Sequence, residues 1–364
     1  MTATLGSLRA LVLDDDPVYR HIVTSSLKRI GLLDTSVASD LAIAQGKLER
    51  EKFDVVSIDV VLREGSGLDL LKWIKAHQPN LITILVTAGS NTNATREVDA
   101  LLLGASALVL KPGGADAASR LDKSFKDIIE SILQHREPVH IAAATPSPGK
   151  QAATGLNDLF PEYRELIAVG ASTGGPPVVQ QLLTSLPMGF ETPIVITQHM
   201  PTLHIEHFAN LLRDRSGRKV SVAKDGERVE PGHVYVAPGG LHLTVKRGGN
   251  LLTLHHDHGP EEHNCKPAVD PMFRSVAKAC GSKCVGIVMT GMGSDGALGA
   301  VELRSKGAPV IAQDKLSSVV WGMPGAVVQK GAASVVVPGS EISSWVSRLD
   351  LSCSKMSRVS GDHK

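Results

Sequence analysis

Short hydrophobic runs alternate with amphipathic stretches along most of the chain. In the first 130 residues, the hydrophobic runs predict strands at Leu8–Leu13, Val55–Ile58, Ile82–Val86 and Ala107–Leu110. Between and after them, apolar residues at helical spacing predict helices over Val18–Ile30, Leu68–Ala76 and Leu121–Leu133. Strands that alternate with helices are typical of a parallel sheet with crossover helices. We therefore expect an open α/β domain over residues 1–133.

The alternation returns near residue 165, after residues 134–164, where prolines and an Ala/Thr-rich run without periodicity predict a linker. The strands predicted beyond it are Leu166–Val169, Ile194–Thr197, Val285–Met289, Pro309–Ala312 and Ser334–Val337. Three short runs with glycines between them predict a small antiparallel insertion: Val234–Val236, Leu241–Val245 and Leu251–Leu254. We therefore predict a second doubly wound parallel-sheet domain over residues 165–353, followed by a polar tail at 354–364.

Composition excludes several classes of protein. Hydrophobic residues make up 42% of the chain and charged residues 21%, which is enough for two globular cores. A net charge of +1 and 3% aromatic residues argue against a nucleic-acid partner. The start of the chain has no signal-peptide pattern and no apolar run is long enough to span a bilayer, so we expect a cytoplasmic protein without direct membrane insertion. Cys280 and Cys284 have no matching second pair, which disfavours a zinc site.

Polar side chains follow four predicted strands of the N-terminal domain. Asp14 and Asp15 follow the first, Asp59 the second, Thr87 the third and Lys111 the fourth. The carboxyl ends of parallel strands share one edge of a sheet, so we expect these side chains to meet. Crowded carboxylates suit Mg²⁺, and the pattern predicts a metal site of Asp14, Asp15 and Asp59. Asp59 is then the nucleophile towards a phosphoryl group whose charge Lys111 pairs with. Each acid taken alone also fits a helix cap.

A serine, a histidine and an aspartate follow strands of the C-terminal domain in the same way. Ser172 is centred in a G-x-S-x-G pattern, whose glycines allow a tight turn that exposes the hydroxyl. His199 follows the next strand, and Asp295 lies in a glycine-rich loop after a later one. These residues fit a nucleophile, its base and the group that orients the base. Taken alone, Ser172 also fits a helix cap or a phosphate-binding loop, and Asp295 a helix cap.

Residues 7–133 resemble the receiver domain of two-component response regulators. The residues that carry the resemblance are Asp14, Asp15, Asp59, Gly67, Thr87, Lys111 and Pro112. It implies a flavodoxin-like fold, phosphorylation of Asp59 by a histidine kinase with Mg²⁺ as cofactor, Thr87 and Lys111 as switch residues, and a cis Lys111–Pro112 bond. Arg63 stands where receivers usually have proline, so we expect a less rigid loop there.

Residues 165–350 resemble the catalytic domain of chemotaxis protein-glutamate methylesterases. The matching segments are 171–175, 197–201, 236–240, 290–296, 311–314 and 322–324. The resemblance implies a Rossmann-like esterase domain that needs no cofactor, with Ser172, His199 and Asp295 as catalytic triad. It also places Thr173 and Met292 near the reacting carbonyl as oxyanion donors.

Together the two resemblances imply a phosphorylation-activated enzyme of chemotaxis adaptation. Its substrates are glutamate γ-methyl esters on the cytoplasmic domains of chemoreceptors, from which it releases methanol, and it also deamidates receptor glutamines. They further imply that the unphosphorylated receiver covers the active site. The alternative is a non-enzymatic response-regulator adaptor that binds a signalling partner. A transcription factor is disfavoured, because the output half has no helix-turn-helix signature and no basic stripe.

Two further segments are open to interpretation. Where the family often has an Arg-His-Arg-Pro-Ser run, this chain has residues 263–268, which bears on substrate fit if those arginines contact the receptor. A histidine-rich stretch resembles a metal site in composition, but neighbouring residues of a strand face opposite sides, so we predict an exposed polar hairpin. Its members are His255, His256, Asp257, His258 and His263. The positions interpretable as either cleft or core are Phe208, Trp321 and Met323.

Overall fold

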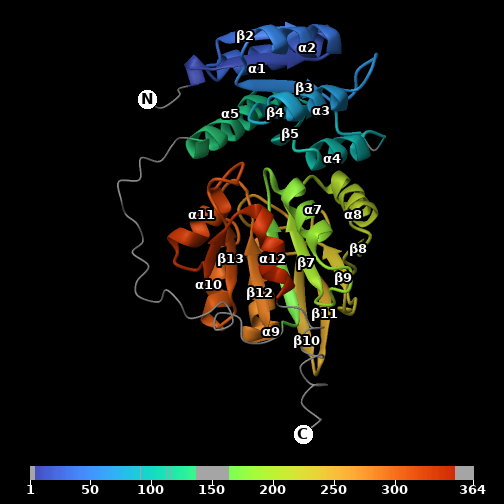
Figure 1. Ribbon diagram of the computed structural model, residues 1–364, viewed down its shortest axis with the longest axis vertical. Coiled ribbons are helices and arrows are strands. Elements are labelled where there is room, and N and C mark those ends of the chain that lie inside the picture. Colours follow the sequence, from blue (N-terminus) through green and yellow to red (C-terminus); the bar gives the residue numbers. More distant parts are fainter. Residues whose placement is uncertain (1–4, 91, 112, 115, 137–163, 349–364) are drawn as a thin grey trace. The chain divides into compact units, whose positions relative to one another are not determined.

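The computed structural model describes residues 5–90, 92–111, 113–114, 116–136 and 164–348. They form two compact units, divided after Arg136, which Figure 1 colours blue to teal and green to red. Most of the predicted linker, the predicted tail and Pro112 lie outside the described residues. None of the helices in the described ranges is both long enough and apolar enough to cross a membrane.

The N-terminal unit is a parallel sheet with the strand order β2-β1-β3-β4-β5. Its strands are β1 (Arg9–Leu13), β2 (Asp34–Ala38), β3 (Val55–Asp59), β4 (Ile82–Thr87) and β5 (Ala107–Leu110). Its helices are η1 (Leu5–Ser7), α1 (Pro17–Arg29), α2 (Leu41–Arg50), α3 (Gly67–His77), α4 (Ala94–Leu102) and α5 (Ala117–Arg136). Helix α1 packs against α5, while α3 contacts both α2 and α4 (Figure 1). The predicted flavodoxin-like fold is confirmed.

Capping side chains explain where the first helices begin. Asp16 accepts hydrogen bonds from the N–H groups of the first turn of α1, and Asp40 and Ser66 do the same for α2 and α3. The three consecutive aspartates after β1 therefore have two different roles. Asp16 caps the helix, which leaves Asp14 and Asp15 at the edge of the sheet.

The C-terminal unit is built on a wholly parallel sheet with the strand order β14-β13-β12-β6-β7-β9-β8. Its strands are β6 (Leu166–Ala171), β7 (Ile194–Gln198), β8 (Lys219–Val222), β9 (His233–Val236), β12 (Cys284–Val288), β13 (Val310–Gln313) and β14 (Val335–Val337). A separate antiparallel hairpin, β10 (His242–Gly248) with β11 (Leu251–Asp257), packs on α9 through β10. The predicted Rossmann-like parallel sheet with a small antiparallel element is confirmed.

Helices of the C-terminal unit form two groups by their contacts. They are α7 (Gly175–Ser185), α8 (Thr202–Ser216), α9 (Val269–Cys280), α10 (Ala297–Ser305), α11 (Gly322–Gln329) and α12 (Ile342–Ser347), with short turns η2 (Gly281–Lys283) and η3 (Gly339–Glu341). Helix α7 contacts α8 and α12, whereas α10 contacts α9 and α11 (Figure 1).

One predicted strand is assigned to the wrong sheet. Val234–Val236, expected in the antiparallel insertion, belongs to β9, which lies between β7 and β8 and pairs in parallel with both. All four residues of β9 are buried, as expected for an inner strand of a parallel sheet. Strands β2 and β8 are missing from the prediction, because both are short, partly polar and at an edge of their sheet.

The order of the strands places two loops side by side. Strand β6 comes first in the C-terminal unit but lies between β7 and β12, so the chain builds one side of the sheet and then returns to the other. Val288 of β12 is in register with Gly170 of β6. The loops after these strands therefore diverge from a topological switch point, where ligands bind in sheets of this kind.

Candidate active site and acidic site

Three carboxylates meet at the carboxyl edge of the N-terminal sheet. Oxygen atoms of Asp14, Asp15 and Asp59 all lie within 4.8 Å of one another. Lys111 Nζ lies 2.9 Å from Asp14 Oδ2 and 2.5 Å from Asp59 Oδ2. Burial raises the pKa of Asp14, against the opposing effect of Lys111. Burial acts to lower the pKa of Lys111, but its bonds to Asp59 and Asp14 outweigh this and raise it. The oxygen donors are of the kind that Mg²⁺ prefers.

Arg63 adds a donor to this cluster. Its backbone N–H donates to Asp15 Oδ2 over 2.6 Å, and its Nε lies 3.6 Å from the same oxygen. The proline usual at this position in receivers has no N–H and no charge. The departure from the receiver pattern therefore gives Asp15 a partner that the usual residue does not supply.

The Thr87 side chain bonds to a residue outside the acidic cluster. Its hydroxyl donates to a carboxylate oxygen of Glu97 on α4. Glu97 is fully buried, although a glutamate in an amphipathic helix is normally expected on the exposed face. The sequence therefore contains no signal for this contact, which holds the Thr87 hydroxyl on the α4 side of the site.

His199 and Asp295 form a buried pair at the carboxyl edge of the C-terminal sheet. His199 Nε2 lies 2.7 Å from Asp295 Oδ2, and the side chains are only 10% and 1% exposed. Burial acts to lower the pKa of His199, but hydrogen bonds with Asp295 and Cys265 outweigh this and raise it to about 9. Burial acts to raise the pKa of Asp295, but the bond to His199 helps to lower it. The pair thus favours an imidazolium beside a carboxylate.

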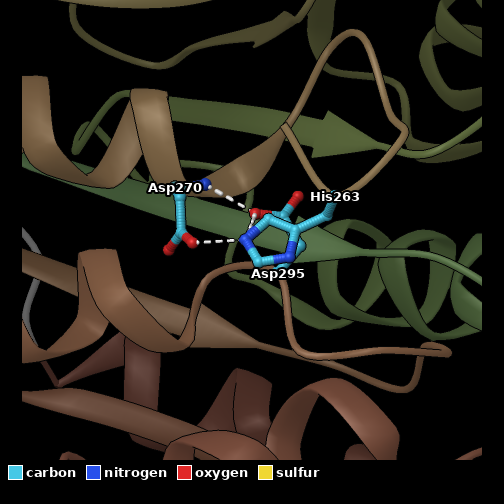
Figure 2. Close-up of side chains that lie close together, drawn as sticks. All are labelled: His263, Asp270 and Asp295. Atoms are coloured by element: carbon cyan, nitrogen blue, oxygen red, sulfur yellow. Dashed lines mark hydrogen bonds and ion pairs between the residues drawn. The ribbon is translucent and has the colours of Figure 1, made fainter. Parts of the chain in front are cut away.

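Backbone donors fix the Asp295 carboxylate. N–H groups of Val269 and Asp270, at the start of α9, donate to it over 2.6 and 2.9 Å, and that of Gly296 over 2.8 Å. Figure 2 shows Asp270 and His263 beside it: His263 Nε2 lies 2.8 Å from Asp270 Oδ2 and 3.8 Å from Asp295 Oδ1. With His199, four hydrogen bonds orient this carboxylate, so its position follows from the packing of α9 on the loop after β12.

The cluster in Figure 2 also has the composition of a metal site, since His263, Asp270 and Asp295 offer ligand atoms within 4.8 Å of one another. Its carboxylates, however, already have protein donors. Asp270 accepts from Gly299 N–H over 2.6 Å as well as bonding His263, and burial raises the pKa of Asp270. A cation would have to displace these donors, so the geometry fits a hydrogen-bonded network around Asp295 better.

Ser172 follows β6 and is held through its backbone. Its N–H donates to Thr290 O over 3.0 Å, and its carbonyl oxygen accepts from Gln198 Nε2 over 2.9 Å. A Cβ added at Gly291 would lie 2.7 Å from Ser172 Cβ, so only glycine allows this approach. No hydrogen bond joins Ser172 Oγ to His199 among the described residues; such bonds often tighten only when substrate binds.

Thr173 and Met292 flank Ser172 from two loops. Thr173 lies in the turn before α7, and Met292 follows Gly291, whose Cα approaches Ser172. In the part of the chain that is described, the backbone N–H groups of Thr173 and Met292 have no acceptor. Both groups are therefore free to donate to a ligand, as the predicted oxyanion role requires.

Comparisons with known proteins identify both units. The family model for the CheB methylesterase matches residues 167–346, and that for the response regulator receiver domain matches residues 10–120. A protein-glutamate methylesterase/protein-glutamine glutaminase of Caulobacter vibrioides is 35% identical, over 93% of this chain and 98% of the relative. One from Xanthomonas oryzae is 37% identical, over 91% and 94%. The chain belongs to the CheB methylesterase family.

A solved structure agrees with this assignment. The CheB methylesterase catalytic domain of Thermotoga maritima is 38% identical, covers 51% of this chain and 98% of that domain, and aligns with a TM-score of 0.50. The chain is therefore a methylesterase with an N-terminal receiver domain, and both family resemblances are confirmed.

This CheB-family methylesterase has residues 263–268 in place of the Arg-His-Arg-Pro-Ser run, and this segment lies beside the His199–Asp295 pair. Cys265 Sγ lies 3.6 Å from His199 Nδ1, and His263 contacts Asp270. The sequence shows that this segment differs from the family pattern. It does not show that Cys265 contacts His199 or that His263 contacts Asp270, because these contacts are formed only in the tertiary structure. Asp270, wholly buried, is a further site residue that the sequence does not reveal.

Of the remaining candidates, the histidines lie on or near the β10–β11 hairpin, whereas Trp321 and Met323 contact Gly291, which packs against Ser172. His255 Nε2 bonds Thr253 Oγ1 over 3.0 Å, while His256 Nε2 bonds Ala223 O over 2.9 Å, so the two rings have separate partners. Phe208 and Met323 are both wholly buried, and the backbone N–H of Met323 donates to Gly291 O over 2.9 Å. Trp321 is partly exposed, and its Nε1–H donates to Gln313 O over 2.9 Å.

Proposed function

We propose that the protein hydrolyses glutamate γ-methyl esters on the cytoplasmic domains of chemoreceptors, with Ser172, His199 and Asp295 as its catalytic triad. The observation that carries the proposal is the His199–Asp295 pair, 2.7 Å apart, at the sheet edge where Ser172 follows β6. A carboxylate cannot donate, so Nε2 of His199 bears a hydrogen, and in the neutral ring Nδ1 is the nitrogen that can accept one. Membership of the CheB methylesterase family supports the same assignment.

In this mechanism the Ser172 hydroxyl attacks the ester carbonyl while His199 Nδ1 takes its proton. The N–H groups of Thr173 and Met292 stabilise the oxyanion. His199 then returns the proton to the departing methoxide, which leaves as methanol. Water, deprotonated by His199, attacks the acyl-enzyme and frees the glutamate and Ser172. With a glutamine substrate the same steps release ammonia, which accounts for a glutaminase activity.

The receiver supplies the control in this proposal. A histidine kinase provides the phosphoryl group, and Asp59 accepts it. Asp14, Asp15 and Asp59 would hold Mg²⁺, and the bound ion would supply positive charge against the negative charge of the transferred group. Lys111 pairs with the phosphoryl oxygens, and Thr87 leaves Glu97 to donate to one of them. This change raises the esterase activity.

The proposed division is a receiver at 1–133, a linker at 134–164, the esterase domain at 165–353 and a tail at 354–364. The cytoplasm is the proposed location, because the substrate domains and the kinase are cytoplasmic.

The proposal is tested by methanol release from a methylated chemoreceptor cytoplasmic fragment, with and without a small acyl-phosphate donor and Mg²⁺. We expect release that rises with the donor, and an Asp59→Asn protein that keeps the basal rate but loses the rise. If the receiver is phosphorylated and no methanol appears, the chain acts as an adaptor or on another ester, and the proposed function is wrong.

Arg63 should weaken Mg²⁺ binding, because its guanidinium competes for Asp15. The pair is largely exposed on the Arg63 side, and exposed ion pairs contribute about 0.2–1 kcal/mol, so Arg63→Ala should tighten Mg²⁺ binding by about 1.4- to fivefold. Titration calorimetry measures it. The matched control is Arg29→Ala, which removes an ion pair with Asp122 away from the cluster. An unchanged affinity in Arg63→Ala argues against this competition.

The esterase should become faster as pH rises. Only neutral His199 can act as base, and its pKa of about 9 leaves it mostly protonated at neutral pH. We expect kcat/KM to rise about tenfold per pH unit below that pKa. Methanol release between pH 6 and 9.5, with the rate of Ser172→Ala subtracted, measures this. A plateau already reached at pH 7.5 shows that the histidine is neutral there and contradicts the prediction.

A further inference from the structure

A tight turn presents Cys265 to the active site. Cys265 and Glu262 exchange backbone hydrogen bonds of 2.9 and 3.3 Å, and His263 and Asn264 between them have φ of 54° and 56°. The Glu262 carboxylate pairs with the guanidinium of Arg274 on α9, with Nη1 3.0 Å from Oε2. The turn is therefore tied to the same helix whose first N–H groups hold Asp295, and Cys265 is kept in one orientation.

The thiol faces the remaining nitrogen of His199. Cys265 Sγ lies 3.6 Å from Nδ1, within hydrogen-bond range for sulfur, while Nε2 is bonded to Asp295. Cys265 is partly exposed, whereas Cys280 and Cys284 are buried. Cys265, His199 and Asp295 are thus connected as a thiol, a base and an orienting carboxylate, the arrangement that activates cysteine nucleophiles.

We propose that Cys265 is a modification site for peroxides, at which His199 generates the thiolate. The thiol gives its proton to His199 Nδ1. The thiolate attacks one peroxide oxygen, so that an S–O bond forms and the O–O bond breaks. The hydroxide that leaves takes the proton from the imidazolium and becomes water. Sulfur is oxidised by two electrons to a sulfenic acid, the peroxide is reduced, and a thiol reductant reverses the change.

The modification has a consequence for turnover that rests on the triad proposed above. Ser172 and Cys265 use the same atom, His199 Nδ1, because Asp295 occupies the other ring nitrogen. A sulfenic acid at Cys265 adds an oxygen next to Nδ1 and can bond to it. The base then cannot take the proton of Ser172, and the esterase stops until the thiol is restored.

Alkylation of the full-length protein tests the pair without measuring turnover. After a short pulse of iodoacetamide at pH 7, peptide mass spectrometry compares Cys265 with the buried Cys280 and Cys284. We expect Cys265 to react about tenfold faster in the parent protein than in His199→Gln, because the imidazolium that holds the thiol's proton stabilises the neighbouring thiolate. Equal alkylation rates of Cys265 in the two proteins would overturn the proposed activation of Cys265 by His199. Thermal unfolding establishes that the variant is folded.

Peroxide treatment of the parent protein gives an independent result. Hydrogen peroxide with dimedone should label Cys265, and absence of the adduct on this thiol overturns the proposal. Peroxide should also remove most of the esterase activity, dithiothreitol should restore it, and Cys265→Ser should keep its own untreated rate. Equal losses in parent and Cys265→Ser overturn the shared-base mechanism. If untreated enzyme releases no methanol, the proposed function fails, while the dimedone result still decides whether Cys265 is modified.

Discussion

Replacing Ser172 with alanine should reduce methanol release by about 10⁴-fold or more, because a triad without its nucleophile retains only the contribution of binding and the oxyanion donors. The substitution should not destabilise the fold. The described hydrogen bonds of Ser172 are made by its backbone, so alanine keeps every one of them. We expect the free energy of unfolding to change by less than about 0.5 kcal/mol. Methanol assays and urea unfolding on the same preparation measure both quantities.

The matched control for this variant is Ser294→Ala. Ser294 is an exposed serine of the loop that carries Asp295, and its hydroxyl has no part in the proposed chemistry. It should leave methanol release within twofold, about 0.4 kcal/mol, of the parent. A Ser172→Ala enzyme with a rate near that of the parent would remove Ser172 from the role of nucleophile.

Asp295→Asn should lose both activity and stability. Asparagine lacks the charge that supports the imidazolium, and its amide can leave His199 with the wrong nitrogen protonated, so kcat should fall by about 10³–10⁴-fold. The carboxylate also accepts three backbone N–H groups, from Val269, Asp270 and Gly296. An amide nitrogen cannot accept them, and one or more buried donors left without a partner cost about 1–3 kcal/mol.

Urea unfolding and kcat for methanol release measure the two effects of Asp295→Asn. The control is Asp225→Asn, where an exposed carboxylate accepts one backbone N–H, from His256; it should change neither quantity beyond about 0.5 kcal/mol. A stable Asp295→Asn protein would mean that the start of α9 does not depend on this carboxylate. An active one would mean that His199 is oriented by other groups.

The fold follows from the sequence where strands are buried. Inner strands such as β3 and β6 appear as continuous apolar runs, because both faces of a parallel sheet are covered. Edge strands β2 and β8 give no such run. Strand β9 shows a different limit: its three predicted residues are apolar, but the sheet to which they belong is decided by pairing with distant β7 and β8.

The candidate site, like the fold, could be predicted from the sequence only in part. Ser172, His199 and Asp295 are found because the end of each strand in a parallel sheet leads to the same edge. Glu97 and Asp270 are not, because a buried acid at a helical position has no local pattern that separates it from an exposed one. The Cys265 contact depends on a turn of two residues with positive φ, His263 and Asn264, which few side chains favour.

The central place of β6 has a consequence for how the protein is made. Leu166 of β6 pairs with Cys284 of β12. The first strand of this unit to leave the ribosome therefore gains its second neighbour only after helices α7, α8 and α9, strands β7, β8 and β9 and the β10–β11 hairpin have been synthesised. Contacts between such distant segments form slowly. His199 is translated long before Asp295, the carboxylate that orients it. The esterase site is therefore assembled late in synthesis, and a nascent chain halted before β12 would expose one side of β6 without having any catalytic power.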